Sequence, residues 1–281
     1  MQNKVLAIND ISCVGRCSLT VALPIISAAG IECSILPTAI LSTHTGGFTG
    51  YTFTDFTSEM GKISDHWKSL NVNFDSIYTG FLGSKEQVDV VKNIVSKFKN
   101  DNVKLIVDPA MADNGSMYGL FDLAFAKEMK KLCVGADVIM PNITEACFLT
   151  DTEYQPIPHT KEFIDLLISR LGELNIKSVG LTGVSYDGIS LGALAHDYTT
   201  NESNYYKREI INEYFHGTGD CFASAFVAAL TKGKTLFEAN KIAVDFTVNS
   251  ILTTIKYSGI DKKYGVCFEE ALGDLMGDIN A

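Results

Sequence analysis

Short apolar runs alternate along the chain with longer segments in which apolar residues recur at helical spacing. A short continuous apolar run is typical of a buried strand, whereas a longer amphipathic segment is typical of a helix. The first part of the chain therefore predicts strands over residues 5–8, 33–36, 76–79, 104–107, 138–140 and 178–181. Helices are predicted between them, over residues 19–29, 53–70, 85–98, 122–132 and 160–174.

The pattern changes after Thr182. Two segments with strand character, 189–196 and 204–211, follow each other as in an antiparallel meander, and helices are predicted over 217–231, 236–254 and 268–276. Alternating strands and helices indicate a mainly parallel sheet with helices on both faces. No linker or shift in composition divides the chain. We expect one three-layer α/β/α domain over residues 1–281, with antiparallel strands at one edge.

Polar residues follow most of the predicted strands. Open α/β sheets bind ligands outside the carboxyl ends of their strands, so these residues are the first candidates for a site. They are Asn9, Asp10, Thr79, Gly80, Asp108, Asn142, Thr182 and Gly183.

Composition narrows the class of protein. Hydrophobic residues make up 46% of the chain and charged residues 20%, an ordinary globular balance. The 33 acidic and 23 basic residues give a formal charge of −10, which argues against a nucleic-acid partner. An anion such as ATP would have to be held by backbone donors, a few cations and a metal ion.

Cysteine usage and hydropathy indicate a compartment. The seven cysteines are odd in number and scattered, which predicts free thiols in a reducing environment. We find no signal-peptide pattern and no apolar stretch of about 18 residues, the length that a membrane span needs. We therefore expect a cytoplasmic protein.

The sharpest motif is His216-Gly217-Thr218-Gly219-Asp220 at the start of a helix of small residues. Glycines let backbone N–H groups turn inward, and a helix N-terminus favours negative charge, so the motif suits a transferring phosphoryl group. Asp220 could accept the proton of an attacking hydroxyl. An ordinary loop-to-helix cap is the alternative. The sequence lacks the Walker G-x-x-x-x-G-K-[ST] motif, and its first strand is not followed by G-x-G-x-x-G.

Two further segments carry carboxylates. Asn142 and Glu145 either hold a hydrated Mg²⁺ near a nucleotide phosphate or form a capping box at a helix start. Asp108 and Asp113 either serve a metal–phosphate site or belong to an ordinary Asx-type turn.

A fourth segment, 42–47, combines hydroxyl groups, the His44 imidazole and two glycines. It either binds a small polar ligand or is a solvated loop.

Taken together, these motifs resemble the pyridoxal kinase group of the ribokinase-like superfamily. The resemblance runs over nearly the whole chain and rests on His44-Thr45-Gly46, Thr79 to Gly83, Asp108-Pro109, Gly115 to Tyr118, Pro141-Asn142-x-x-Glu145 and Gly217 to Asp220. It implies a ribokinase-like three-layer sandwich and ATP-dependent phosphorylation of the 5′-hydroxymethyl group of pyridoxal, pyridoxine or pyridoxamine. It also implies Mg²⁺ with ATP as co-substrate, assistance by a monovalent cation such as K⁺, and a homodimer.

The resemblance also assigns roles to residues. Asp220 is the implied general base, and Gly217, Thr218 and Gly219 form the implied anion hole. Implied ATP contacts are Asp108, Asn142, Glu145, Thr182, His216, Gly217 and Gly219. Implied metal ligands are Asp108, Asp113 and Glu145. Implied substrate contacts are Asp10, His44, Thr45, Phe81, Tyr118 and Asp220.

Departures from the family pattern keep alternatives open. Many members carry Ile-Gln-Ser-His after the first strand, whereas this chain has Ile8-Asn9-Asp10-Ile11, which places a carboxylate where a serine usually meets the ring. Asp10 would favour a protonated ring nitrogen or the amine of pyridoxamine. The main rival is hydroxymethylpyrimidine (phosphate) kinase, which commonly carries Gly-Thr-Gly-Cys; here the cysteine comes one place later, at Cys221. A non-catalytic vitamer-binding protein is a third alternative.

Overall fold

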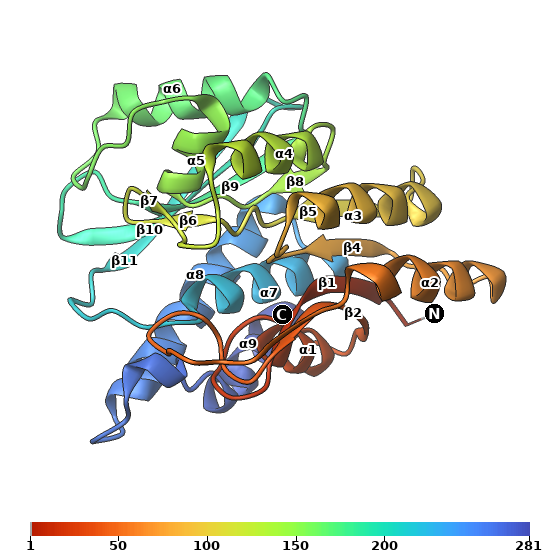
Figure 1. Ribbon diagram of the computed structural model, residues 1–281. Coiled ribbons are helices and arrows are strands. Elements are labelled where there is room, and N and C mark those ends of the chain that lie inside the picture. The colour runs from red at the N-terminus through yellow and green to blue at the C-terminus, as the bar shows by residue number, and fades with distance from the viewer. Residues whose placement is uncertain (1) are drawn as a thin grey trace.

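The computed structural model describes residues 2–281 and shows a mixed sheet between two layers of helices (Figure 1). The sheet has nine strands in the order β11-β10-β9-β8-β5-β4-β1-β2-β3. These strands are β1 Lys4–Ser12, β2 Glu32–Leu41, β3 Phe53–Asp55, β4 Ser76–Thr79, β5 Lys104–Val107, β8 Val138–Ile139, β9 Ser178–Val184, β10 Ser190–Asp197 and β11 Glu202–Glu209. A separate small hairpin pairs β6 Ala112–Asp113 with β7 Ser116–Met117.

The helices divide between the two faces of the sheet. One face carries α2 Thr57–Ser69, α3 Lys85–Phe98, α4 Leu123–Cys133, α5 Ile143–Thr150 and α6 Lys161–Gly172. The other carries α1 Leu19–Ala28, α7 Thr218–Thr231, α8 Leu236–Ile255 and α9 Leu272–Asn280. Short 3₁₀ turns lie at Lys262–Tyr264 and Glu269–Ala271.

Burial on both faces explains why the inner strands are apolar at every position. In β1, Leu6 and Ile8 pack into the core under α2–α6, and Val5 and Ala7 pack into the core under α1 and α7–α9. Successive strand residues point to opposite faces, so a strand covered on both sides needs apolar residues throughout. The predicted three-layer α/β class is therefore confirmed.

The last helix is predicted over 268–276 but spans Leu272–Asn280, after a 3₁₀ turn. Three further boundary differences bear on the site. β1 continues past Ile8 to Ser12, so Asn9 and Asp10 lie inside the strand rather than after it. β2 likewise continues through Pro37, which stands opposite Asn9 just before the register between β1 and β2 shifts. An irregularity in the pairing accommodates a residue that has no N–H to donate.

The third difference concerns the predicted helix 53–70. Its first residues, Phe53–Asp55, form β3 instead and pair antiparallel with the end of β2. Antiparallel strands thus occur at both edges of the sheet, since β10 and β11 form the other. The pairing partner of β3 is remote in sequence, which is why the local pattern predicts a helix there.

Two other sequence expectations concern thiols and membranes. All seven cysteines are free thiols. Within residues 2–281, no helix combines the length and the apolar character that crossing a membrane requires.

Candidate active site

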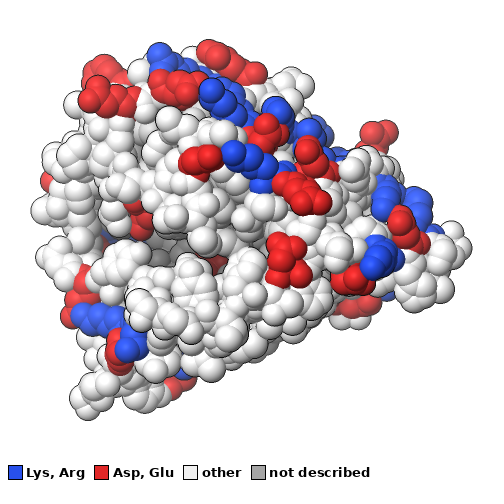
Figure 2. All heavy atoms as spheres, in the orientation of Figure 1, with Lys and Arg blue, Asp and Glu red and all other residues white. Residues whose placement is uncertain are grey.

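Four carboxylates gather at the carboxyl ends of the central strands. Asp108 directly follows β5, Asp10 lies near the end of β1, and Asp220 and Glu145 lie in the first turns of α7 and α5. Figure 2 shows the surface hollowed in this region, between the β6–β7 hairpin and the start of α7, with acidic side chains in the wall. We call this hollow, with Asp10, Asp108, Glu145 and Asp220, the acidic recess. Among residues 2–281, none of the four forms an ion pair with Lys, Arg or His.

The start of α7 has the geometry expected of an anion hole. Gly217 caps the helix in the left-handed region, at φ 78°. A Cβ atom there would lie 2.2 Å from the backbone oxygen of Arg16, so only glycine fits. Gly219 faces open space, because nothing lies within 4 Å of its would-be Cβ. The first-turn N–H groups and the helix dipole thus lie at an open surface, as anion binding requires.

Asp220 occupies this first turn. Burial raises the pKa of its carboxyl to about 7, opposed by a hydrogen bond from the Ser18 backbone and reinforced by the charge of Asp10. A carboxyl with a pKa near neutrality is a far better proton acceptor than an ordinary aspartate, which titrates near 4.

Glu145 and Asn142 form the capping box that their spacing predicts. Glu145 Oε2 accepts a 2.9 Å hydrogen bond from the Asn142 N–H, and Asn142 Oδ1 accepts one of 2.9 Å from the Glu145 N–H. Glu145 Oε1 also accepts a 3.0 Å bond from the Met111 N–H, which ties α5 to the segment after β5. The cap therefore fixes a carboxylate that still lies beside Asp108.

Asp108 and Glu145 interact strongly. Burial raises the pKa of Asp108 well above its usual range, and the charges of Glu145 and Asp220 raise it further. Burial likewise raises the pKa of Glu145 to about 8, against hydrogen bonds from Asn142, Met111 and Ala112. Two such carboxyls do not both ionise readily without a cation, so this pair fits a divalent metal with oxygen ligands.

Residues 2–281 contain no group of three or more His, Cys, Asp or Glu side chains arranged to hold a metal ion. The carboxylate of Asp113 instead accepts hydrogen bonds from the backbone and side chain of Asn114, at 2.8 and 3.0 Å, and from Tyr214. Asp113 thus takes part in the ordinary turn that its sequence also suggested. A Mg²⁺ ion here would take few protein ligands and complete its shell with phosphate and water oxygens.

Asp10 is nearly fully buried, at 4% exposure. Its carboxylate accepts a 3.1 Å hydrogen bond from Ser12 Oγ and another from Ser18, and burial raises its pKa. It lies close enough to Asp220 for the two charges to interact. A buried carboxylate with only neutral partners favours a ligand that brings a proton or a positive charge.

The segment 42–47 is packed rather than solvated at His44. His44 Nδ1 accepts a 3.2 Å bond from the Gly46 N–H, so Nε2 carries the proton that it shares with the Lys263 carbonyl at 2.5 Å. The His44 ring also lies 5.0 Å from the His216 ring, centroid to centroid. Burial lowers the pKa of both imidazoles, and His44 lowers that of His216 further. Thr45 next to this cluster is exposed.

The other predicted residues divide between two places. Thr182 lies inside β9 and bridges to Asn142, its N–H donating to the Pro141 carbonyl at 3.0 Å. Phe81 and Tyr118 belong to an aromatic group with Phe121, with ring centroids 5.5 and 6.4 Å apart.

Sequence reasoning named Thr79 but missed other polar residues beside the carboxylates, namely Ser18, Tyr78 and Ser224. Ser18 donates to Asp220 and Asp10. The hydroxyls of Tyr78, Thr79 and Ser224 are buried without a hydrogen-bond partner in the described part of the chain. A signal was present in the predicted strand Ser76 to Thr79, where three of the four residues carry a hydroxyl group.

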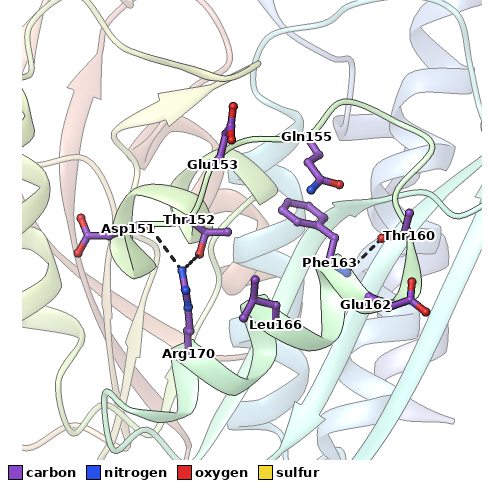
Figure 3. Close-up of a pocket in the computed structure, with 9 residues that line it drawn as sticks. All are labelled: Asp151, Thr152, Glu153, Gln155, Thr160, Glu162, Phe163, Leu166 and Arg170. Atoms are coloured by element: carbon purple, nitrogen blue, oxygen red, sulfur yellow. Dashed lines mark hydrogen bonds between the residues drawn. The ribbon is translucent and has the colours of Figure 1, made fainter.

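A pocket of about 500 Å³ lies at the far end of α5 from Glu145 (Figure 3). Its wall combines acidic, amide and apolar side chains with Arg170, which donates to Thr152 Oγ1 at 2.8 Å. None of the predicted site residues lines it.

Comparisons with known proteins identify the family of the chain. The family model for phosphomethylpyrimidine kinase matches residues 23–265. A Bacteroides thetaiotaomicron protein assigned to the phosphomethylpyrimidine kinases, crystallised with pyridoxal, is 35% identical with a TM-score of 0.92, covering 98% of this chain and 96% of its own. Pyridoxal kinase from Lactobacillus plantarum is 27% identical with a TM-score of 0.90, covering 99% and 98%. Pyridoxal kinase from Dictyostelium discoideum is 28% identical over 241 residues, 80% of this chain and 77% of that protein.

The fold and the family match are therefore those of a ribokinase-like, ATP-dependent kinase. More specifically, the chain belongs to the phosphomethylpyrimidine kinase family, whose relatives include pyridoxal kinases.

Proposed function

We propose that this protein transfers the γ-phosphoryl group of ATP to the 5′-hydroxymethyl group of pyridoxal, pyridoxine or pyridoxamine. The observation that carries the proposal is Asp220, with a pKa raised to about 7, in the first turn of a glycine-opened helix. The pyridoxal kinases among its relatives, and the relative crystallised with pyridoxal, support this acceptor.

The reaction follows from this arrangement. The hydroxymethyl oxygen attacks the γ-phosphorus, the bond from that phosphorus to the β,γ-bridging oxygen breaks, and ADP leaves. Asp220 takes the hydroxyl proton, and the N–H groups of Gly217 to Gly219 stabilise the transferring oxygens. Asp108 and Glu145, with Asp113 as a third candidate, would hold Mg²⁺, which neutralises phosphate charge when bound.

Further assignments extend the proposal to both substrates. We propose that the vitamer contacts Asp10, His44, Thr45, Phe81 and Tyr118. We propose that ATP contacts Asn142, Thr182 and His216. Thr182 and Asn142 are bridged beside Glu145, which supports the second set. We also propose K⁺ as an accessory cation, a homodimer, and a cytoplasmic location, the last supported by the free thiols.

Hydroxymethylpyrimidine or its phosphate is the second candidate acceptor, favoured by the family model that matches the chain. The position after Gly219 argues for the B6 vitamers, because an aspartate stands there and the cysteine follows it.

Product analysis decides between these acceptors. Purified protein is incubated with Mg-ATP and, separately, each B6 vitamer and hydroxymethylpyrimidine, and ADP and phosphorylated product are quantified. We expect the highest kcat/KM with a B6 vitamer. We also expect Asp220→Asn to bind the acceptor normally while losing nearly all turnover, at least about 10²-fold. Binding of pyridoxal by the wild type without any release of ADP would refute the kinase proposal.

Asp10 allows a sharper test of substrate choice. Its buried carboxylate accepts side-chain hydrogen bonds only from the hydroxyls of Ser12 and Ser18. An N–H or ammonium group of the ligand would therefore supply a further hydrogen bond to this carboxylate. We expect Asp10→Ser to lower kcat/KM for pyridoxamine more than for pyridoxine, by about tenfold in the ratio. Equal kcat/KM for all three vitamers, unchanged by the substitution, would contradict this role.

A further inference from the structure

A ladder of polar side chains runs between β4 and α7 toward the acidic recess. At its inner end, Ser76 Oγ and Thr231 Oγ1 are hydrogen-bonded at 2.9 Å, which fixes the C-terminal end of α7 against β4. Thr231, Ser224 and Asp220 share one face of α7, since steps of seven and four residues return to nearly the same side of a helix. On the strand, Ser76 and Tyr78 share the face that packs under α7.

Two further hydroxyl groups in this row, those of Tyr78 and Ser224, lie on the core side of Asp220. Tyr78 lies beside Ile106 of β5, and Asp108 follows Ile106 by two residues, on the same face. Ser224 lies one turn inward from Asp220 on α7. The pKa of Tyr78 is raised well above normal by burial and further by the charges of Asp108, Asp220 and Asp10, which agrees with its position on the strand beside the carboxylates.

Both hydroxyls lack a partner among the described residues. Tyr78 and Ser224 are each 0% exposed, and neither Tyr78 Oη nor Ser224 Oγ makes a hydrogen bond with residues 2–281. A buried hydroxyl left unpaired destabilises the fold, and buried polar groups in native proteins are paired with protein or with ordered water. Two such hydroxyls on facing elements therefore point to a shared ligand that can both donate and accept.

We propose that one ordered water molecule binds Tyr78 Oη and Ser224 Oγ and donates a hydrogen bond to the Asp220 carboxylate from the core side. A water suits this place because a typical buried water makes about three hydrogen bonds, and a carboxylate oxygen of Asp220 is the third partner at hand. Tyr78 is then a positioning residue: it never touches the acceptor, and it holds the base through the water. The inference rests on Asp220 as the base of the proposed function, whichever acceptor the kinase prefers.

Crystallography tests the water directly and needs no activity. We expect a wild-type crystal structure at about 1.5 Å resolution to show one water within 3.2 Å of Tyr78 Oη, Ser224 Oγ and an Asp220 oxygen. In Tyr78→Phe this water should be lost or displaced. Wild-type density in which the two hydroxyls bond other groups, with no water between them, would overturn the proposal.

Kinetics test the positioning role, using whichever acceptor gives turnover. We expect Tyr78→Phe and Ser224→Ala each to lower kcat about tenfold and to leave KM for ATP and acceptor within about twofold, because binding surfaces stay intact while the base loses its support. Ser76→Ala is the matched control: it removes a buried hydroxyl of the same ladder farther from the recess, so it should lower Tm without lowering kcat.

Wild-type kcat in both Tyr78→Phe and Ser224→Ala would overturn the positioning role even if the water is present. Failure of the proposed function has a different signature, namely turnover with hydroxymethylpyrimidine rather than a vitamer.

Discussion

Two glycines at the start of α7 have opposite tolerances for a side chain. Gly217 has a positive φ, and a Cβ atom built there would lie only 2.2 Å from the Arg16 carbonyl oxygen. A Cβ atom built at Gly219 would point into open space. One residue therefore serves the fold and the other leaves room in the recess.

A matched pair of alanine variants separates these roles. We expect Gly217→Ala to destabilise the protein by about 2–4 kcal/mol, since it adds backbone strain and a steric clash. Gly219→Ala should keep or slightly raise stability, because alanine favours helix, yet lower kcat/KM for ATP by about tenfold by crowding the phosphates. Urea unfolding and steady-state kinetics measure both effects. Equal stability loss in the two variants would contradict this account.

Asp108 illustrates a residue whose charge opposes folding. Its folded-state pKa is raised, so ionisation above that pKa disfavours the fold, and the penalty disappears as pH falls and the carboxyl is protonated. We expect Asp108→Asn to be more stable than wild type by about 1 kcal/mol at pH 8, with the gain shrinking toward pH 4, and to be much less active. Thermal melts across this pH range provide the measurement.

Asp187 supplies a control of opposite sign. Its pKa is lowered by hydrogen bonds from Lys207 and Ser190, so its charge stabilises the fold above the ordinary aspartate pKa. Asp187→Asn should therefore be less stable than wild type at pH 8 and approach it at low pH. The same sign in both variants would show that the Asp108 effect does not arise from its charge.

At the scale of elements, α5 combines a structural cap with a chemical role. Asn142 accepts from the Glu145 N–H through its Oδ1 and donates from Nδ2 to the Ala112 carbonyl at 2.8 Å. It thereby fixes the helix start, Glu145 and the β6–β7 hairpin together. The capping-box and metal-site interpretations of this segment are compatible, because one carboxylate can cap a helix and face a ligand.

The capping box of α8 is the comparison for this helix. Thr235 and Glu238 form the same reciprocal bonds at an exposed helix start away from the recess. We expect Asn142→Ala and Thr235→Ala each to cost about 1–2 kcal/mol in unfolding free energy, and only Asn142→Ala to reduce kcat/KM for ATP, by about tenfold or more. A comparable loss of activity in Thr235→Ala would mean that general destabilisation, not the position of Glu145, is responsible.

Across the whole molecule, the charge of −10 shapes how an anionic substrate arrives. Lys, Arg, Asp and Glu intermix along the upper and right-hand edges of the view, while acidic atoms and no basic ones stand out in the hollow (Figure 2). Long-range attraction therefore does not assist ATP, and binding depends on short-range backbone donors and a cation.

Salt dependence tests this view. Raising NaCl from about 50 to 200 mM at constant KCl and MgCl₂ screens repulsion between the protein and Mg-ATP, so kcat/KM for ATP should hold steady or rise up to about threefold. A steep fall with salt would instead reveal a cationic binding surface.

The sequence by itself determined the layer order, the family resemblance and the segments from which the site is built. These depend on local information: the period of apolar residues reports burial on one or both faces, and the glycines before Asp220 report a special backbone. It also indicated the capping box at Asn142 and Glu145, whose partners lie three residues apart.

Only the tertiary structure decided features that depend on residues remote in sequence. β3 forms because the end of β2 offers it a pairing edge, and Asp10 is buried because β1 extends beyond its apolar run. The raised pKa of Asp220 and the unpaired hydroxyls of Tyr78 and Ser224 exist only because α7 packs over β4 and β5. Burial and electrostatic coupling are sums over spatial neighbours, and no local pattern encodes that sum.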